Sequence, residues 1–330
     1  MADVVQNNIV SVHFSNLKLL ESDVMYRKSP VMLVVFALLL GLTACGIGRD
    51  EKERMDVVTG FYLLSYVSNQ VGGDLLDVTT LASKGAQPHD MRLSLKQRIR
   101  VADADLVEYL KGLQPSLDKA VIDHNKDRGF DAAGVEPLLD GNTPVEGANA
   151  DNDPLAQDSR GKDPHVWLSP IRMADLVKAV AKRFDEIEPT EVARFDKAAA
   201  KLRGRLQAFD QEIGTALSNC ASRTFVVSHN SFGYFAERYN LKQIAIRGLS
   251  PTEAPSAERL AEVSRLAKQS HVKTVFVENP GNPQEAQTVA SQVGATTAKL
   301  DPLETAPAKG DYFSVMRANV AALRTALQCR

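Results

Sequence analysis

The stretch TFVVSHNSFGYFAERY, residues 224–239, contains the pattern that decides the fold. Residues 224–228 form a short segment in which apolar and β-branched side chains predominate, which is typical of a buried strand. Residues 232–239 have the composition and spacing of a short helix, and His229 lies at the junction between the two segments. A strand followed at once by a helix is the repeating unit of a parallel α/β sheet.

The same alternation continues in both directions from this stretch. Upstream, strands are predicted at 55–59, 75–81, 106–109 and 134–139, and helices at 62–71, 93–101, 117–122 and 170–187. Downstream, strands are predicted at 241–246, 272–278 and 296–300, and helices at 257–269, 283–293 and 312–327. Such alternation predicts parallel sheets that are covered by helices on both faces. Since 330 residues exceed the usual size of one core, two lobes are expected.

One longer amphipathic stretch separates the two series. Between residues 189 and 217, apolar side chains recur at intervals of three and four, as on one face of a helix. A helix of about 28 residues would span about 42 Å. We therefore predict two similar lobes of (β/α)4 type, residues 46–188 and 219–330, joined by one long rigid helix over residues 189–218.

The first 45 residues indicate export and a lipid anchor. Two basic residues precede an apolar run at 31–44, which is shorter than the roughly 20 residues of a transmembrane helix. The run ends LTACG, like the bacterial lipobox, in which the cysteine becomes lipidated. We expect residues 25–45 to be a lipoprotein signal peptide, Cys45 to carry the lipid, and the protein to be extracytoplasmic and anchored to the membrane. Residues 1–24 are expected to be an upstream extension that is not translated, because Met25 makes a normal signal start.

The net charge and the two remaining cysteines bear on the partners of the protein and on its disulfide bonding. The net charge of −2, without a basic stripe, argues against a nucleic-acid partner. Cys220 and Cys329 remain after Cys45 is assigned to lipid, and an exported chain permits a disulfide between them. Two free thiols are the alternative.

Three of the six histidines lie at junctions ahead of a helix. His89 stands in GAQPHDM, His165 in KDPHVWLSP and His229 in the stretch quoted above. Two belong to the first lobe and one to the second, which suits a ligand site in a cleft between lobes. Asp301, which follows an apolar strand, is the expected fourth ligand, and Glu278 at another strand end is the alternative. Three imidazoles and one carboxylate suit Zn²⁺, with Mn²⁺ as the second choice.

Residues 140–163 break the α/β pattern. They carry six acidic residues against two basic ones and almost no large apolar side chain. We expect an exposed loop that acts as a linker, and weak gathering of cations is the alternative.

These motifs resemble the metal-binding solute-binding proteins of bacterial ABC importers, the zinc and manganese group, over about residues 55–328. The resemblance rests on the motifs GAQPHD, DPHVWLSP, VVSHNSFGYFAERYNL, LSPTEAPSAERL and LDPL. The resemblance implies two (β/α)4 lobes, a rigid linking helix, and one metal held by the residues matching His89, His165, His229 and Asp301. It also implies a monomer that is no enzyme and that delivers its metal to an ABC permease with an ATPase subunit.

Histidine at position 229 matches the zinc carriers of this family, since manganese carriers tend to have Glu there. The chain departs from the family in two places. The loop 140–163 lacks the histidines that zinc members often carry, and residues 112–115 read GLQP where the family has GLEP. Three alternatives remain open: a manganese or iron carrier, a zinc hydrolase with Glu278 as base if Asp301 is not a ligand, and a surface adhesin.

Overall fold

The computed structural model describes residues 54–83, 85–141, 161–251, 254–278 and 282–330, and residues 54–330 form one compact unit. The predicted signal peptide at 25–45, its Cys45 and the extension at 1–24 lie outside the described residues, as does most of the loop 140–163. Among the described helices, none combines the length and the apolar character that a membrane crossing needs.

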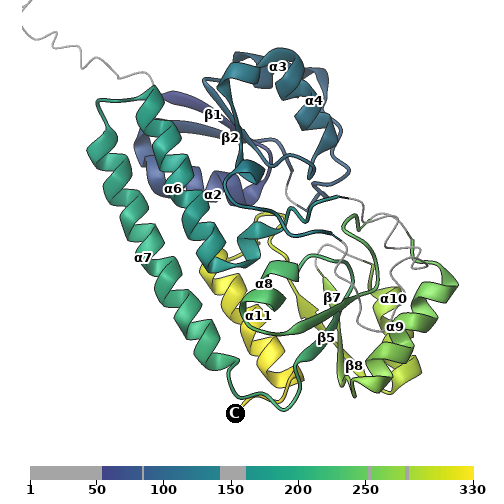
Figure 1. Ribbon diagram of the computed structural model, residues 1–330. Helices are drawn as coiled ribbons and strands as arrows, with labels where there is room; N and C mark the ends of the chain where they lie inside the picture. Colours follow the sequence, from purple (N-terminus) through teal and green to yellow (C-terminus); the bar gives the residue numbers. More distant parts are fainter. Residues whose placement is uncertain (1–53, 84, 142–160, 252–253, 279–281) are drawn as a thin grey trace, which may run out of the picture. The chain divides into compact units, whose positions relative to one another are not determined.

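Within the described residues, eight strands form two sheets of four, and every pair of neighbouring strands is parallel (Figure 1). The first sheet has the order β2-β1-β3-β4 and defines the first lobe. Its strands are β1 (Met55–Thr59), β2 (Leu76–Thr80), β3 (Leu106–Tyr109) and β4 (Gly129–Asp131). The second sheet has the order β6-β5-β7-β8 and defines the second lobe. Its strands are β5 (Thr224–Val227), β6 (Lys242–Ala245), β7 (Thr274–Glu278) and β8 (Thr296–Leu300). The predicted fold class, two α/β lobes with parallel sheets, is confirmed.

Helices cover both faces of each sheet. The first lobe is covered by α2 (Tyr62–Gly72), α3 (Leu95–Asp103), α4 (Pro115–His124) and α6 (Pro170–Ile187). The second lobe is covered by α8 (Gly233–Arg238), α9 (Ala257–Gln269), α10 (Pro283–Val293) and α11 (Tyr312–Ala326). Successive residues of a strand therefore enter different cores: Val57 packs with the α2 side and Val58 with the α3–α4 side.

Local sequence signals start and stop these helices. Ser94 caps α3 through a reciprocal pair of bonds with Gln97, the third helical residue. Pro115 and Pro283 occupy the first turn of α4 and α10, where a missing N–H is harmless. Gly294 ends α10 in the left-handed conformation that glycine adopts without strain.

The long helix α7 (Val192–Ala216) runs beside both lobes (Figure 1). It packs against α2 and α6 of the first lobe and against α11 of the second. Phe195 lies 5.4 Å from Phe184 of α6, and Phe209 lies 5.4 Å from Phe313 of α11, measured between ring centroids. One buried stripe of a single helix thus belongs to the cores of both lobes. At 25 residues the helix spans about 38 Å.

One strand prediction was wrong. The fourth strand of the first sheet is β4, three residues long, rather than 134–139. Asp131 ends it by accepting a hydrogen bond from Ala133 N, which starts a short 3-10 turn. Gly129 begins it where the chain passes so close to Val121 that a Cβ atom would lie 2.6 Å from that side chain. The apolar run at 134–139 instead contains Pro137, which cannot donate to a strand ladder.

The end of the second lobe is closed by a disulfide between Cys220 and Cys329. The two residues also form an isolated antiparallel bridge, so the C-terminus lies against the segment that leads into β5.

Candidate metal centre

Four side chains from both lobes bring their ligand atoms together in the described part of the chain. They are His89, His165, His229 and Glu304, and these atoms all lie within 4.8 Å of one another. Glu304 Oε1 lies 3.1 Å from His229 Nε2, 3.3 Å from His89 Nε2 and 3.5 Å from His165 Nε2. The side chains are 8% exposed for His89, 3% for His229 and fully buried for the other two. No second such group occurs within the described ranges.

The fold places these residues where parallel sheets bind ligands. His89 lies between β2 and α3, His229 follows β5, and Glu304 follows β8. His165 immediately precedes the short helix Val166–Leu168 that leads into α6. The carboxyl ends of parallel strands and the loops after them are the usual ligand edge of an open α/β sheet.

The fourth member of the cluster is Glu304, whereas the sequence led us to expect Asp301. Asp301 Oδ1 accepts a hydrogen bond from Leu303 N at 2.8 Å. Asp301 also lines a hollow of about 350 Å³ together with Lys309 and Asn319, none of which belongs to the cluster. Leu303 has a φ of 59°, and this left-handed residue redirects the chain so that Glu304 enters the cluster. The sequence DPLE contains both acids. A positive φ is uncommon for leucine, and no feature of the sequence predicts it at position 303.

Glu278, the alternative ligand, instead supports His229 from behind. Its Oε2 atom forms a hydrogen bond with His229 Nδ1, and its Oε1 accepts one from Ser231 Oγ at 3.1 Å. Asp163 supports His165 in the same way, since its Oδ1 lies 2.7 Å from His165 Nδ1 and 2.9 Å from His165 N. A ring that donates from Nδ1 to a carboxylate presents the lone pair of Nε2. Both rings therefore turn Nε2 toward the cluster.

Three atoms at the centre of this cluster are buried without a hydrogen-bond partner: His165 Nε2, His229 Nε2 and Glu304 Oε2. The contacts of Glu304 Oε1 with His165 and His229 have the distance of an ion pair but lack the alignment of a hydrogen bond. Buried polar atoms are nearly always paired, and unpaired ones that converge on one point suit a cation.

Neighbouring carboxylates favour protons on two of the three histidines of the cluster. Burial lowers the pKa of His89. Burial also opposes charge on His165 and His229, but Asp163 and Glu278 outweigh it, so both pKa values are raised, that of His229 to about 10. Burial alone would raise the pKa of Glu304, but its close contacts with the three histidines hold it well below its usual range. A metal entering this site must displace protons from imidazole nitrogen.

The geometry of the cluster suits a tetrahedral ion. Zinc bonds of 2.0–2.1 Å at tetrahedral angles place ligand atoms about 3.3 Å apart. The three distances from Glu304 Oε1, between 3.1 and 3.5 Å, bracket that value. A set of three nitrogen donors and one oxygen donor also suits zinc better than magnesium or calcium, which favour oxygen donors.

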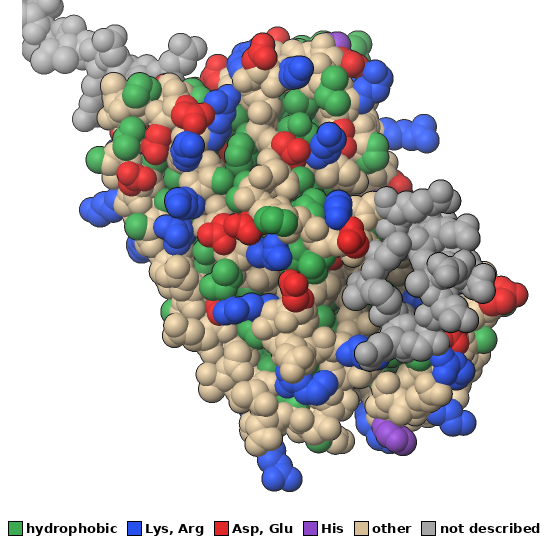
Figure 2. Space-filling model, viewed as in Figure 1, with side chains coloured by type: hydrophobic (Ala, Val, Ile, Leu, Met, Phe, Trp, Pro, Cys, Tyr) green, Lys and Arg blue, Asp and Glu red, His purple; other side chains and the backbone are tan. Residues whose placement is uncertain are grey.

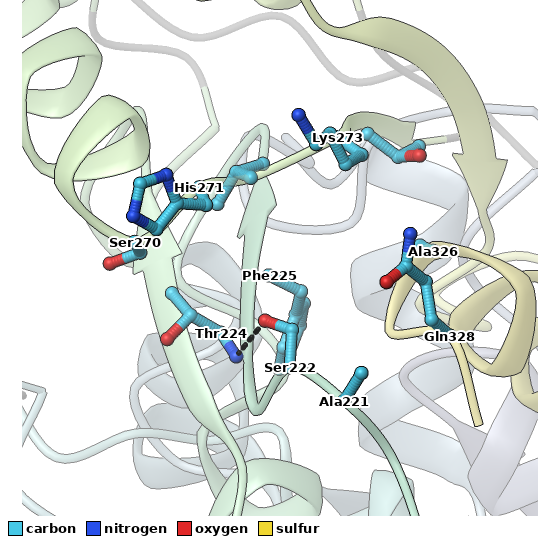
Figure 3. Close-up of a pocket in the computed structure, with 11 residues that line it drawn as sticks. Ala221, Ser222, Thr224, Phe225, Ser270, His271, Lys273, Ala326 and Gln328 are labelled. Atoms are coloured by element: carbon cyan, nitrogen blue, oxygen red, sulfur yellow. Dashed lines mark hydrogen bonds between the residues drawn. The ribbon is translucent and has the colours of Figure 1, made fainter.

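A second hollow, of about 210 Å³, lies beside the amino ends of β5 and β7. Figure 3 shows Ser270 and His271 on one side of it and Gln328 on the other. Among its lining residues His271 is the only histidine, cysteine or carboxylate. This hollow therefore lacks a metal donor set, and His271 is a histidine that stands apart from the cluster.

Two α/β lobes that share a long helix and enclose a buried His₃Glu cluster define a class of two-lobed metal-binding proteins. The chain belongs to the family described as zinc-uptake complex component A, periplasmic, whose model matches residues 57–326. The family resemblance inferred from the sequence motifs is thereby confirmed.

Two relatives and one solved structure show how close the match is. The chain is 33% identical over 302 residues to the zinc-binding lipoprotein AdcA of Streptococcus pneumoniae, covering 89% of this chain and 60% of AdcA. It is 30% identical over 323 residues to the high-affinity zinc uptake system protein ZnuA of Bacillus subtilis, covering 92% of this chain and 99% of ZnuA. The crystal structure of the Zn(II)-bound ZnuA-like domain of S. pneumoniae AdcA superposes with a TM-score of 0.68 at 31% identity, covering 83% of this chain and 99% of that domain. The chain thus spans about 60% of the length of AdcA and nearly all of ZnuA.

Proposed function

We propose that this chain is the extracytoplasmic substrate-binding protein of an ABC zinc importer. It captures Zn²⁺ between its lobes and delivers the ion to a membrane permease that is driven by an ATPase subunit. The observation that carries this proposal is the buried cluster of His89, His165, His229 and Glu304, whose possible ligand atoms converge from both lobes. Relatives named as zinc-binding and zinc-uptake proteins support it.

Zinc is the proposed cargo, and manganese is the alternative. Imidazole is a better ligand for zinc than for manganese, which favours oxygen donors. Three of the four donors here are imidazole nitrogens, and one of them is His229, where a carboxylate would favour manganese. Distances near 3.3 Å between Glu304 Oε1 and the three Nε2 atoms also favour tetrahedral coordination.

Capture suits this site better than hydrolysis. A catalytic zinc has three protein ligands and an open position for water, whereas this cluster offers four ligands. Glu278, the candidate base, is already engaged by His229 and Ser231. We therefore propose a binding protein with no catalytic activity.

The proposed partners follow from the proposed transport role. Cys45 would carry a lipid that tethers a monomer to the bacterial membrane, and the lipoprotein name of AdcA supports this anchor. An extracytoplasmic location also suits the periplasmic description of the family. On the face drawn in Figure 2, Lys and Arg are interspersed with Asp and Glu, and the net charge of the chain is −2.

Metal analysis of protein purified from a defined medium tests this function. One zinc per chain is expected in the wild type and in His271→Ala, because His271 lies outside the cluster. The ion should be lost from His229→Ala. Retention of stoichiometric zinc by His229→Ala would reject the site, and displacement of zinc by equimolar Mn²⁺ would favour the manganese alternative.

A further inference from the structure

The turn that delivers Glu304 to the cluster is built around one unfavourable backbone conformation. After β8 the chain reads Asp301-Pro302-Leu303-Glu304, and Leu303 is fully buried with a φ of 59°. A residue with a side chain adopts this left-handed region only where its surroundings fix it. Some other part of the structure must therefore hold this turn.

Asn319 of α11 provides the first restraint. Its Oδ1 atom accepts a hydrogen bond from Asp301 N at 2.9 Å, and its Nδ2 group donates to Asp301 O at 2.7 Å. Asn319 is only 3% exposed, so its amide is held in place by the surrounding packing. The Asp301 carboxylate adds a third bond by accepting from Leu303 N at 2.8 Å, which closes the turn around its left-handed residue.

Trp167 of the first lobe provides a second restraint. Its Nε1 group donates to Pro302 O at 2.7 Å, and Tyr312 OH donates to Trp167 O at 2.9 Å. Trp167 is 1% exposed and follows His165 by two residues. The hydrogen bond therefore ties the segment that carries His165 to the turn that carries Glu304.

We propose that Asp301 and Asn319 are positioning residues that fix Glu304 as the fourth ligand of the metal, with Trp167 setting its separation from His165. This inference rests on the proposed function, in that zinc is taken as the ligand. These hydrogen bonds keep Glu304 Oε1 within 3.1–3.5 Å of three Nε2 atoms. Affinity and preference for a tetrahedral ion both depend on that preset geometry.

Asp301 could act by positioning Glu304 or by coordinating the metal itself, and an alanine variant alone would not distinguish these two roles. A positioning Asp301 needs only an oxygen that accepts from Leu303 N, and asparagine supplies one. A coordinating Asp301 needs a charged carboxylate, which asparagine lacks. Asp301→Asn should therefore bind zinc within about threefold of the wild type, whereas Asp301→Ala should lose about 10- to 100-fold, the usual cost of removing an outer partner of a metal site.

The experiment measures Zn²⁺ affinity by chelator competition and records the visible spectrum of the Co²⁺-substituted protein. Wild type and Asp301→Asn should give the intense bands of tetrahedral cobalt, while Asp301→Ala and Asn319→Leu should give weaker bands and lower affinity. Asp311→Ala is the matched control, because it removes the cap of α11 without touching the turn. It should lower the melting temperature and leave zinc affinity and the cobalt spectrum unchanged.

Equal damage from Asp301→Asn and Asp301→Ala would overturn the positioning role, as would wild-type affinity in Asp301→Ala. If Asp311→Ala lost as much zinc affinity as Asp301→Ala, the loss would be explained by general destabilisation, and the proposal would be overturned. Failure of the wild type to bind zinc would instead reject the proposed function.

Discussion

Glu108 gives the sharpest test of the first lobe, because it is a carboxyl group buried on the central strand β3 and forms no ion pair with any described residue. It is fully buried, and its Oε1 atom has no hydrogen-bond partner. Ser68 Oγ has one hydrogen and contacts both Leu64 O, at 2.9 Å, and Glu108 Oε2. When Ser68 donates to Leu64, its contact with Glu108 requires a proton on the carboxyl group. Burial raises the pKa of Glu108 from 4.5 to about 8, in agreement with a neutral acid.

The sign of the effect on stability follows from this raised pKa. The folded protein keeps a proton that the unfolded chain releases above pH 4.5, so the contribution of Glu108 is complete below 4.5 and is lost as the pH rises to about 8. At 1.36 kcal/mol for each tenfold change, this amounts to about 3 to 4 kcal/mol between pH 5 and pH 8. Glu108→Gln keeps the shape of the side chain and removes its charge, so its unfolding free energy should lack this loss.

The assay is urea unfolding at pH 5 and pH 8, followed by far-UV circular dichroism, for the wild type and Glu108→Gln. The difference in unfolding free energy between the two proteins should move by about 3 to 4 kcal/mol in favour of Glu108→Gln as the pH rises. Glu186→Gln is the matched control, since Glu186 is exposed on α6 and paired with Arg183, and its difference should move by less than about 1 kcal/mol. Parallel pH curves for wild type and Glu108→Gln would refute the buried neutral acid.

Three further predictions concern the metal site and the disulfide. Asp163→Asn should weaken zinc binding by about 10- to 100-fold in a chelator competition, because the Nδ1 partner of His165 loses its charge; unchanged affinity would contradict its orienting role. Zinc affinity should rise with pH, because the raised pKa values of His165 and His229 leave protons to be displaced; calorimetry at pH 5.5 and 7.5 should show a clear increase, and equal affinities would contradict it. The double variant Cys220→Ser/Cys329→Ser should lose about 4 to 5 kcal/mol of stability, as expected for a bridge with a separation of 109 residues, and an unchanged melting temperature would argue against the bridge.

The sequence was sufficient for most of the secondary structure, because apolar periodicity and local helix signals agree along the chain. The helices 170–187, 257–269 and 283–293 were predicted with the bounds that the structure has. The strand β4 was missed because three residues are too few for a periodic pattern, and its ends depend on contacts with Val121 and on the turn at Asp131. Those contacts are set by tertiary packing and leave little trace in sequence.

In the cluster, too, some residues could be predicted from local sequence patterns, whereas another depends on contacts between distant parts of the chain. The three histidines could be found because each follows a recognisable motif ahead of a helix. Which of Asp301 and Glu304 enters the cluster could not be read from the sequence, because it depends on the φ of Leu303. That angle depends in turn on Asn319, which lies 18 residues from Asp301 along the chain. Strand-end reasoning selects the first acid after β8, and only the folded turn exposes the second.

Trp167 has a practical consequence beyond its hydrogen bond. It is the only tryptophan among 330 residues, so the ultraviolet emission of the protein at long wavelength comes from one buried ring. The centroid of that ring lies 5.2 Å from that of the His165 imidazole. Protonation of this imidazole, or its coordination to an ion, changes the electric field at the indole. We therefore expect the emission of Trp167 to change with occupancy of the site, so that binding can be followed without attaching a dye.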